Sequence, residues 1–219
     1  MIRDVDIADI SDGRFYTASD MVKADTMDCA GCSSCCRTMT DTIFLDPWDI
    51  FMMRRATGLT FEQLMEERIS LSVADGLVTP VMGMREDGAC TFLTGEDRCS
   101  IHPDRPGFCR LFPLGRYYEG GDFRYFLQVK ECPKPKVKIR VSRWLGIDDL
   151  PFYEDYVRSW HGFRQQVMHL LEGTGDELRR QVCLYLLQLF YRRDWDEEES
   201  FYTQFEERLK RARQDLSLA

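Results

Sequence analysis

The sequence predicts an α+β fold, in which a loop-rich cysteine domain with short strands and helices precedes a helical C-terminal segment. Eight of the nine cysteines lie between Cys29 and Cys132. Short β-prone runs, interrupted by Gly, Pro and Asp, follow one another over residues 76–132. Beyond residue 150, apolar side chains recur at steps of three and four residues, which is the period of an amphipathic helix.

We divide the chain into an N-terminal lead-in (1–28), a cysteine domain (29–135) and a helical C-terminal segment (136–219). With 219 residues and 44% hydrophobic composition, the chain is long enough for a sizeable core. Scattered apolar residues among acids predict a loose lead-in, with one short helix around residues 19–24.

Two helices are predicted in the cysteine domain. Asp46 is a typical N-cap, Pro47 suits the first helical position, and Gly58 lies where this helix should end. Thr60 and Gln63 then form a capping-box pattern at the start of a second helix.

The rest of the cysteine domain is β-prone, and the helical segment follows a basic run. We expect short strands in "GLVTPVMGMREDG", "ACTFL" and "GDFRYFLQVKECP". The run "PKPKVKIRVSRWLG" is interpreted as an exposed strand or linker, and the alternative is a docking surface for an acidic partner. Helices are expected over 153–171, 178–190 and 201–212.

Composition excludes several classes of protein. A net charge of −8 argues against nucleic acid as the partner. No run reaches the roughly 18 apolar residues of a membrane span, and the acidic start does not resemble a secretory signal. We therefore expect a cytoplasmic protein with no membrane partner, for which an unidentified partner protein stays open.

Four cysteines lie within the eight residues 29–36, and in a reducing compartment such spacing more often indicates metal binding or catalysis than disulfides. The steps Cys29-x2-Cys32-x2-Cys35 are short enough for three thiolates to surround one centre. Adjacent side chains diverge, so Cys35 and Cys36 either serve different sites or one of them is not a ligand. Inert buried thiols and a redox disulfide switch are the less favoured alternatives.

Two metal chemistries fit these cysteines. Eight cysteines would allow two structural zinc sites, although Cys90, Cys99, Cys109 and Cys132 contain no second close pair. The C-x2-C-x2-C run together with Cys132-Pro133 partly matches ferredoxin-type ligation, which favours an iron–sulfur cluster for at least one site and keeps zinc as the alternative. Cys183 lies in a helical apolar pattern and is expected in the core.

Other polar residues near the cysteines have two interpretations each. His102 is either a metal ligand or a loop histidine that hydrogen-bonds the turn. Arg105 and Arg110 are expected to offset thiolate charge, and Arg37 is a further candidate. Asp46 and Asp49 could supply oxygen ligands, but capping already accounts for Asp46.

The motifs "CAGCSSCCR", "LDPWDI", "CTFLTGEDRCSIHPDRPGFCRLFPLG" and "ECP" resemble the bacterial YkgJ-like family, described as a zinc- or iron-chelating domain with a CxxCxxCC motif. The resemblance runs from about Cys29 to Pro133, roughly half of the chain. It implies a metal-chelating role for eight residues, namely Cys29, Cys32, Cys35, Cys36, Cys90, Cys99, Cys109 and Cys132.

The same resemblance raises an enzymatic alternative, because this domain also occurs in flagellin lysine N-methylases. The sequence has no glycine-rich turn of the kind that holds S-adenosylmethionine, and no CxxxCxxC spacing. The prediction is therefore a metal-binding protein with a structural or redox role, and the alternative is a metal-dependent protein-modifying enzyme such as a protein lysine N-methylase.

Overall fold

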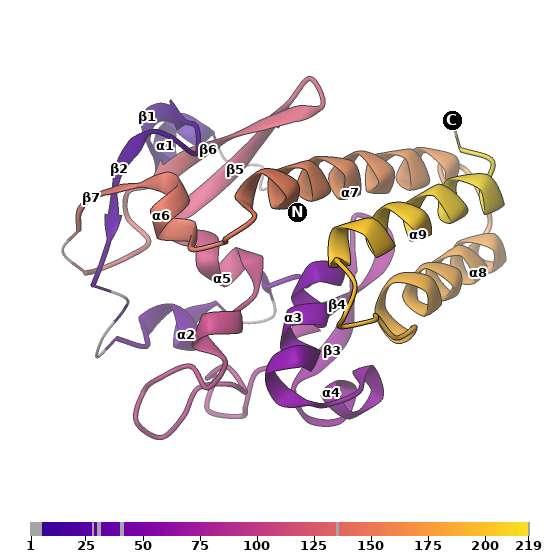
Figure 1. Cartoon of the computed structure of the whole chain (residues 1–219), viewed down its shortest axis with the longest axis horizontal. Coiled ribbons are helices and arrows are strands. Elements are labelled where there is room, and N and C mark those ends of the chain that lie inside the picture. The colour runs from indigo at the N-terminus through magenta and orange to yellow at the C-terminus, as the bar shows by residue number, and fades with distance from the viewer. Residues whose placement is uncertain (1–5, 28, 30–31, 40–41, 135, 219) are drawn as a thin grey trace.

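The computed structural model describes residues 6–27, 29, 32–39, 42–134 and 136–218, and it confirms the α+β class. Most strands lie at one end of the molecule, and the long C-terminal helices lie at the other (Figure 1). Helix α3 (Pro47–Thr57) lies between them, beside α5 (Gly107–Leu111) and the cysteine-bearing loops.

The described strands form three small antiparallel sheets, ordered β1-β6-β5, β2-β7 and β3-β4. Two of the three sheets join the N-terminal strands to strands more than a hundred residues later. The strands are β1 (Ser11–Tyr16), β2 (Met21–Asp25), β3 (Ile69–Ala74), β4 (Leu77–Met82), β5 (Leu114–Glu119), β6 (Asp122–Gln128) and β7 (Val137–Arg140).

The helix expected around residues 19–24 is wrong, because this stretch forms β2. Val22 and Ala24 are buried and alternate with exposed Met21 and Lys23, which is the period of a strand. The pairing with β7 supplies the hydrogen bonds that a helix would have made internally. The lead-in is thus built into the sheets and is not loose, whereas the three-part division of the chain stays a prediction.

The run "ACTFL" also differs from the expected strand. It forms turns, and only isolated bridges link Met84 to Cys90 and Leu93 to Cys99. In contrast, strands lie in both of the other β-prone runs, as β4 and β6. The segment between β4 and β5 therefore consists mainly of loops, and cysteines recur along it.

The predicted helix starts are confirmed. The Asp49 amide donates to the Asp46 carboxylate at 2.9 Å and the Asp46 amide donates back to Asp49 at 2.9 Å, while Gly58 ends α3 with φ of 69°. The remaining described helices are α1 (Ile7–Ile10), α2 (Ser34–Thr38), α4 (Phe61–Glu67), α6 (Val141–Leu145), α7 (Leu150–Leu170), α8 (Asp176–Leu187), α9 (Phe201–Asp215), the short 3-10 helix η2 (His102–Asp104) and the π-helical turn η3 (Gln188–Arg192).

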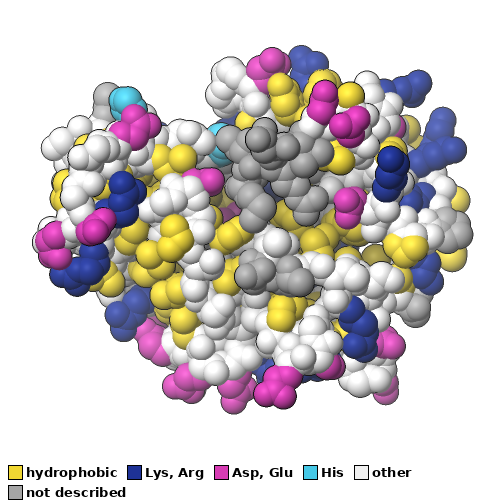
Figure 2. All heavy atoms as spheres, turned by 180° about the vertical axis from the view of Figure 1, so that it is seen from behind, with side chains coloured by type: hydrophobic (Ala, Val, Ile, Leu, Met, Phe, Trp, Pro, Cys, Tyr) yellow, Lys and Arg dark blue, Asp and Glu magenta, His cyan; other side chains and the backbone are white. Residues whose placement is uncertain are grey.

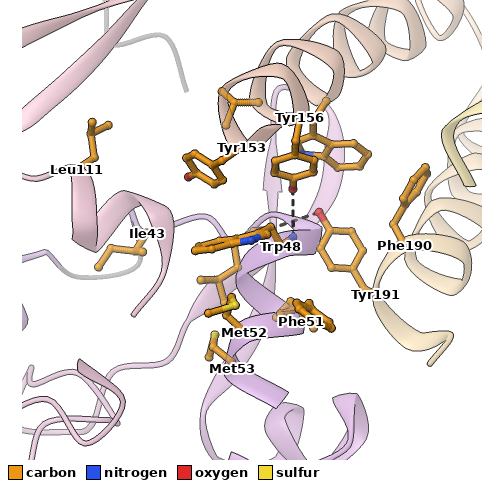
Figure 3. Packing of buried hydrophobic residues seen from close by; sticks show 14 of the residues in the cluster. Ile43, Trp48, Phe51, Met52, Met53, Leu111, Tyr153, Tyr156, Phe190 and Tyr191 are labelled. Atoms are coloured by element: carbon orange, nitrogen blue, oxygen red, sulfur yellow. Dashed lines mark hydrogen bonds between the residues drawn. The ribbon is translucent and has the colours of Figure 1, made fainter. Parts of the chain in front are cut away.

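The helical segment packs against α3 through aromatic side chains (Figure 3). The rings of Trp48 and Tyr153 lie 4.9 Å apart, and the backbone amide of Trp48 donates to the Tyr156 hydroxyl at 3.1 Å. Tyr156 also meets Phe205 of α9 at 4.6 Å. One continuous core thus joins the cysteine domain to the C-terminal helices.

Charged side chains lie mainly towards the rim of the rear face, and hydrophobic side chains occupy much of its middle (Figure 2). Among the described residues, no helix combines the length and the apolar character needed to cross a membrane.

Replacing Phe163 with alanine should lower the free energy of unfolding by about 3–5 kcal/mol, because this ring is fully buried in α7 and leaves a cavity. The control is Phe152→Ala in the same helix, where the ring is 63% exposed and stacks only on Tyr202. Its cost should stay below about 1.5 kcal/mol. Urea unfolding of both variants measures the difference, and equal costs would contradict the assigned core.

Candidate metal centre

The cysteines between residues 29 and 132 come from five short segments that the fold brings together. Cys29 lies in a turn after β2, Cys35 and Cys36 lie on α2, and Cys109 lies on α5. Cys90 and Cys99 lie in the loops between β4 and η2, and Cys132 follows β6. The helices α2 and α5 have only five residues each. The backbone around the thiols therefore has little regular structure of its own.

Backbone hydrogen bonds connect these segments directly. The amide of Cys90 donates to the carbonyl of Cys36 at 2.8 Å, which joins α2 to the loop 54 positions later. Within that loop, the amide of Leu93 donates to Cys90 at 2.9 Å, and a bridge pairs Leu93 with Cys99. Hydrogen bonding thus links the segments that carry Cys36, Cys90 and Cys99.

Electrostatics shows that most of the thiols share one buried neighbourhood. Burial raises the pKa of the Cys109 thiol well above its ordinary value, and nearby thiolate charge, first that of Cys90 and then that of Cys35, raises it further. Burial likewise raises the pKa values of Cys29, Cys90 and Cys99, and each is also raised by charge on Cys35.

The vicinal pair on α2 lies at the centre of this neighbourhood. Cys36 donates a hydrogen bond to the Cys35 sulfur, which lowers the pKa of Cys35 to about 7 although burial opposes the shift. The same hydrogen bond, followed by burial, raises the pKa of Cys36. The pKa values of the two neighbours therefore move in opposite directions, that of Cys35 downward and that of Cys36 upward.

Two predicted ligands lie less centrally. The amide of Cys32 donates to the carbonyl of Cys29 at 3.0 Å, and the Cys32 thiol contacts the Ser34 hydroxyl at 3.7 Å. Cys132 lies near enough for its charge to raise the pKa of Cys29 after burial has done so. Cys183 is buried on α8, where its sulfur accepts from the Val78 amide at 3.5 Å, so its core position is confirmed.

The thiols are neighbours without forming a finished ligand sphere. Among the described residues, no three Cys, His, Asp or Glu side chains converge closely enough to hold one metal ion. The donor set itself fits a thiophilic metal, because it consists of free thiols in a partly buried setting. The ligand assignment of the eight cysteines therefore stays a prediction.

Arginines surround the thiols in different ways. Burial raises the pKa values of Cys29 and Cys99, and the charge of the Arg105 guanidinium acts in the opposite direction on both. The same charge adds to the lowering of the pKa of Cys35. Arg105 therefore offsets thiolate charge as expected. It also contacts Nε2 of His102, whose role as a ligand stays a prediction. Arg37 instead pairs with Asp97 at 2.6 Å, which connects α2 to the loop before Cys99.

The contacts of Arg110 are mainly with backbone carbonyls. Its guanidinium donates to the carbonyls of Pro103, of Leu145 at 3.5 Å and of Gly146 at 3.4 Å, and it lies 5.7 Å from the Trp48 ring. The backbone carbonyls at the end of α6 take up this cation because they need donors. Arg110 therefore holds loops together, and its role towards the thiolates stays a prediction.

Arg85 is a residue that sequence reasoning missed. Its guanidinium donates to the carbonyl of Leu93 at 2.8 Å. Burial raises the pKa of Cys90, and the charge of Arg85 partly counteracts this shift. Its position five residues before Cys90 was the available signal.

Asp49 also has a role that the capping pattern did not reveal. Its carboxylate accepts from the amide of Gly107 at 2.6 Å, which fixes the start of α5 against α3. A Cβ atom at Gly107 would lie 2.2 Å from the Tyr153 hydroxyl, so this position requires glycine. The contact positions Cys109 two residues further along α5.

We compared the sequence of this segment with models of known protein families. Residues 28–133 match the CxxCxxCC family, whose description is "Putative zinc- or iron-chelating domain". This segment, which we call the CxxCxxCC domain, is similar to that family. No curated protein and no solved structure matches the chain. The match begins one residue before Cys29 and ends one residue after Cys132, so the CxxCxxCC domain contains all eight neighbouring cysteines and excludes Cys183.

Asp49→Ala should lower the free energy of unfolding by about 2–4 kcal/mol, because it removes a cap interaction and leaves the buried Gly107 amide without its acceptor. Gln63→Ala is the matched control, since Gln63 occupies the same capping-box position in α4 but is exposed. The control should lose about 1 kcal/mol or less. Chemical denaturation compares the two, and a larger loss in the control would contradict the role assigned to Asp49.

Proposed function

We propose that the CxxCxxCC domain binds zinc or iron through its cysteine thiolates, and that this metal holds the loops of the domain in place. The observation that carries the proposal is the position of Cys35. Its charge acts on five other thiols from four separate segments, namely Cys29, Cys36, Cys90, Cys99 and Cys109.

The energetic argument concerns the charge of these thiols. A metal ligand must be a thiolate, yet burial and mutual repulsion oppose ionisation at most positions. The guanidinium groups of Arg85 and Arg105 are too few to neutralise all of these thiolates. A bound divalent cation would offset the repulsion directly, and its binding would release the thiol protons.

The loops of the domain supply the second argument. Between β4 and β5 the described chain forms only turns, bridges, η2 and the five-residue helix α5. Such a segment has little regular secondary structure of its own, and coordination would cross-link it to α2. Metal binding would then contribute folding free energy, as it does in small metal-dependent domains.

We assign the eight cysteines to this role in two groups. Cys35, Cys36, Cys90, Cys99 and Cys109 would form the inner set, since their thiols influence one another most broadly. The outer set consists of Cys29, Cys32 and Cys132. Because Cys35 and Cys36 are adjacent on a helix, they would serve separate centres or leave one thiol outside the coordination sphere.

Metal analysis can identify the bound metal directly. The C-x2-C-x2-C run and Cys132-Pro133 favour an iron–sulfur cluster with a redox role, and zinc with a structural role is the alternative. Either choice requires the eight cysteines to remain reduced, which fits the reducing conditions of the cytoplasm. Purification without oxygen, metal analysis and a visible spectrum distinguish a coloured iron–sulfur protein from a colourless zinc protein.

The enzymatic alternative, a protein lysine N-methylase, rests on the resemblance and stays a prediction. Such an enzyme would need a pocket beside Arg105 and Arg110. Two surface cavities outlined by described residues are lined elsewhere, one between the turn at 193–199 and α9 and the other beside β7 and α6.

Cys35→Ser and Cys109→Ser should each weaken metal binding at least about tenfold and lower the melting temperature, because each removes a thiolate from the inner set. Cys183→Ala is the control, since this buried cysteine lies outside the CxxCxxCC domain. Metal analysis after equilibration with a competing chelator measures the effect. Full metal content in both serine variants would overturn the assignment.

Removing the metal with a chelator should raise amide hydrogen exchange over residues 84–111, because the loops lose their cross-links there. The helices α7 and α9 should keep their protection, since aromatic packing stabilises them independently. Mass spectrometry of exchanged peptides resolves the two regions. Uniform loss of protection across the chain, or none in the loops, would contradict a metal that orders this domain alone.

A further inference from the structure

A groove lies beside β7 and α6, outside the cysteine neighbourhood. Its volume is about 680 Å³. The basic residues Lys138, Arg140 and Arg143 line it together with the apolar residues Met21, Ile139 and Ile147. We call these six residues the basic groove.

The cations of the basic groove lack partners within the chain as far as the structure describes it. Lys138, Arg140 and Arg143 are exposed and make no ion pair or side-chain hydrogen bond with any described residue. Other arginines, such as Arg158 and Arg192, pair with carboxylates at 2.6 and 2.7 Å. In a chain with a net charge of −8, three unpaired cations along one groove form a local concentration of positive charge.

The strand register adds to the positive charge. Lys23 of β2 lies directly opposite Lys138 of β7, and Met21 lies opposite Arg140. Like charges at directly opposed positions repel each other and destabilise a strand pair. In the rear view, Lys and Arg side chains gather along the edge on the side where β7 lies (Figure 2). An anionic partner would relieve this repulsion.

We propose that the basic groove binds an acidic, extended segment of a partner protein. Carboxylates of that segment pair with Lys138, Arg140 and Arg143, and an aliphatic side chain packs on Met21, Ile139 and Ile147. Charge complementarity of this kind steers association and confers specificity.

The lining of the groove favours a polypeptide over a nucleic acid. Asp148 is part of the lining and can accept a hydrogen bond from a peptide amide, a donor that a phosphodiester group lacks. The lining contains no aromatic side chain on which a base could stack. The net negative charge of the whole chain would also repel a long polyanion.

The position of the groove connects it to the CxxCxxCC domain. Strand β2 ends at Asp25, four residues before Cys29, and β7 begins at Val137, five residues after Cys132. The Lys136 ammonium group donates to the carbonyl of Cys132 at 2.7 Å. A partner in the basic groove would therefore lie where both ends of the domain meet.

Fluorescence anisotropy with the full chain tests the proposal, using a labelled peptide of alternating Glu and Leu residues as the probe. Binding should weaken as salt rises. Arg140→Glu and Arg143→Glu should each weaken it about tenfold. Arg124→Glu is the matched control, because Arg124 is an exposed arginine on β6 outside the groove, and it should change binding less than about twofold.

Met21→Ser tests the apolar part of the groove without threatening the fold, since Met21 is 51% exposed. It should weaken peptide binding while circular dichroism stays unchanged. The proposal is overturned if the peptide does not bind, if Arg124→Glu weakens binding as much as Arg140→Glu, or if a short duplex DNA or an anionic lipid vesicle binds the basic groove more tightly than the peptide.

Discussion

The hydrogen bond from the Gly107 amide to the Asp49 carboxylate is the contact on which the arrangement of the cysteine domain depends. Asp49 belongs to α3, whose buried face packs on the C-terminal helices through Trp48. Gly107 begins α5, which carries Cys109. One buried carboxylate therefore connects the aromatic core to the thiol neighbourhood, and the missing side chain of Gly107 permits this approach.

The thiol neighbourhood combines two opposing tendencies. The fold gathers cysteines from distant segments, and burial then makes most of them harder to ionise. Cys35 differs because it accepts a hydrogen bond from Cys36. Ionising several such thiols without a cation costs free energy, and a bound metal ion would offset that cost. This agrees with the zinc- or iron-chelating description of the family.

The remainder of the chain provides a rigid support and an exposed face. Aromatic contacts among α3, α7, η3 and α9 make a core that does not depend on the cysteines. The β2–β7 pair closes the other side, where it joins the two ends of the domain. The cysteine-bearing loops thus adjoin both a hydrophobic body and a two-stranded sheet, which carries the basic groove.

The sequence by itself determined the features that depend on near neighbours along the chain. The caps at Asp46 and Thr60, the end of α3 at Gly58 and the periodic C-terminal helices all follow from local hydrogen bonding and apolar spacing. Only the tertiary structure decided that residues 21–25 form a strand, because its partner lies more than a hundred residues later. It likewise decided that Arg110 serves backbone carbonyls and that Asp49 reaches Gly107, since contacts between distant segments leave no periodic pattern in the sequence.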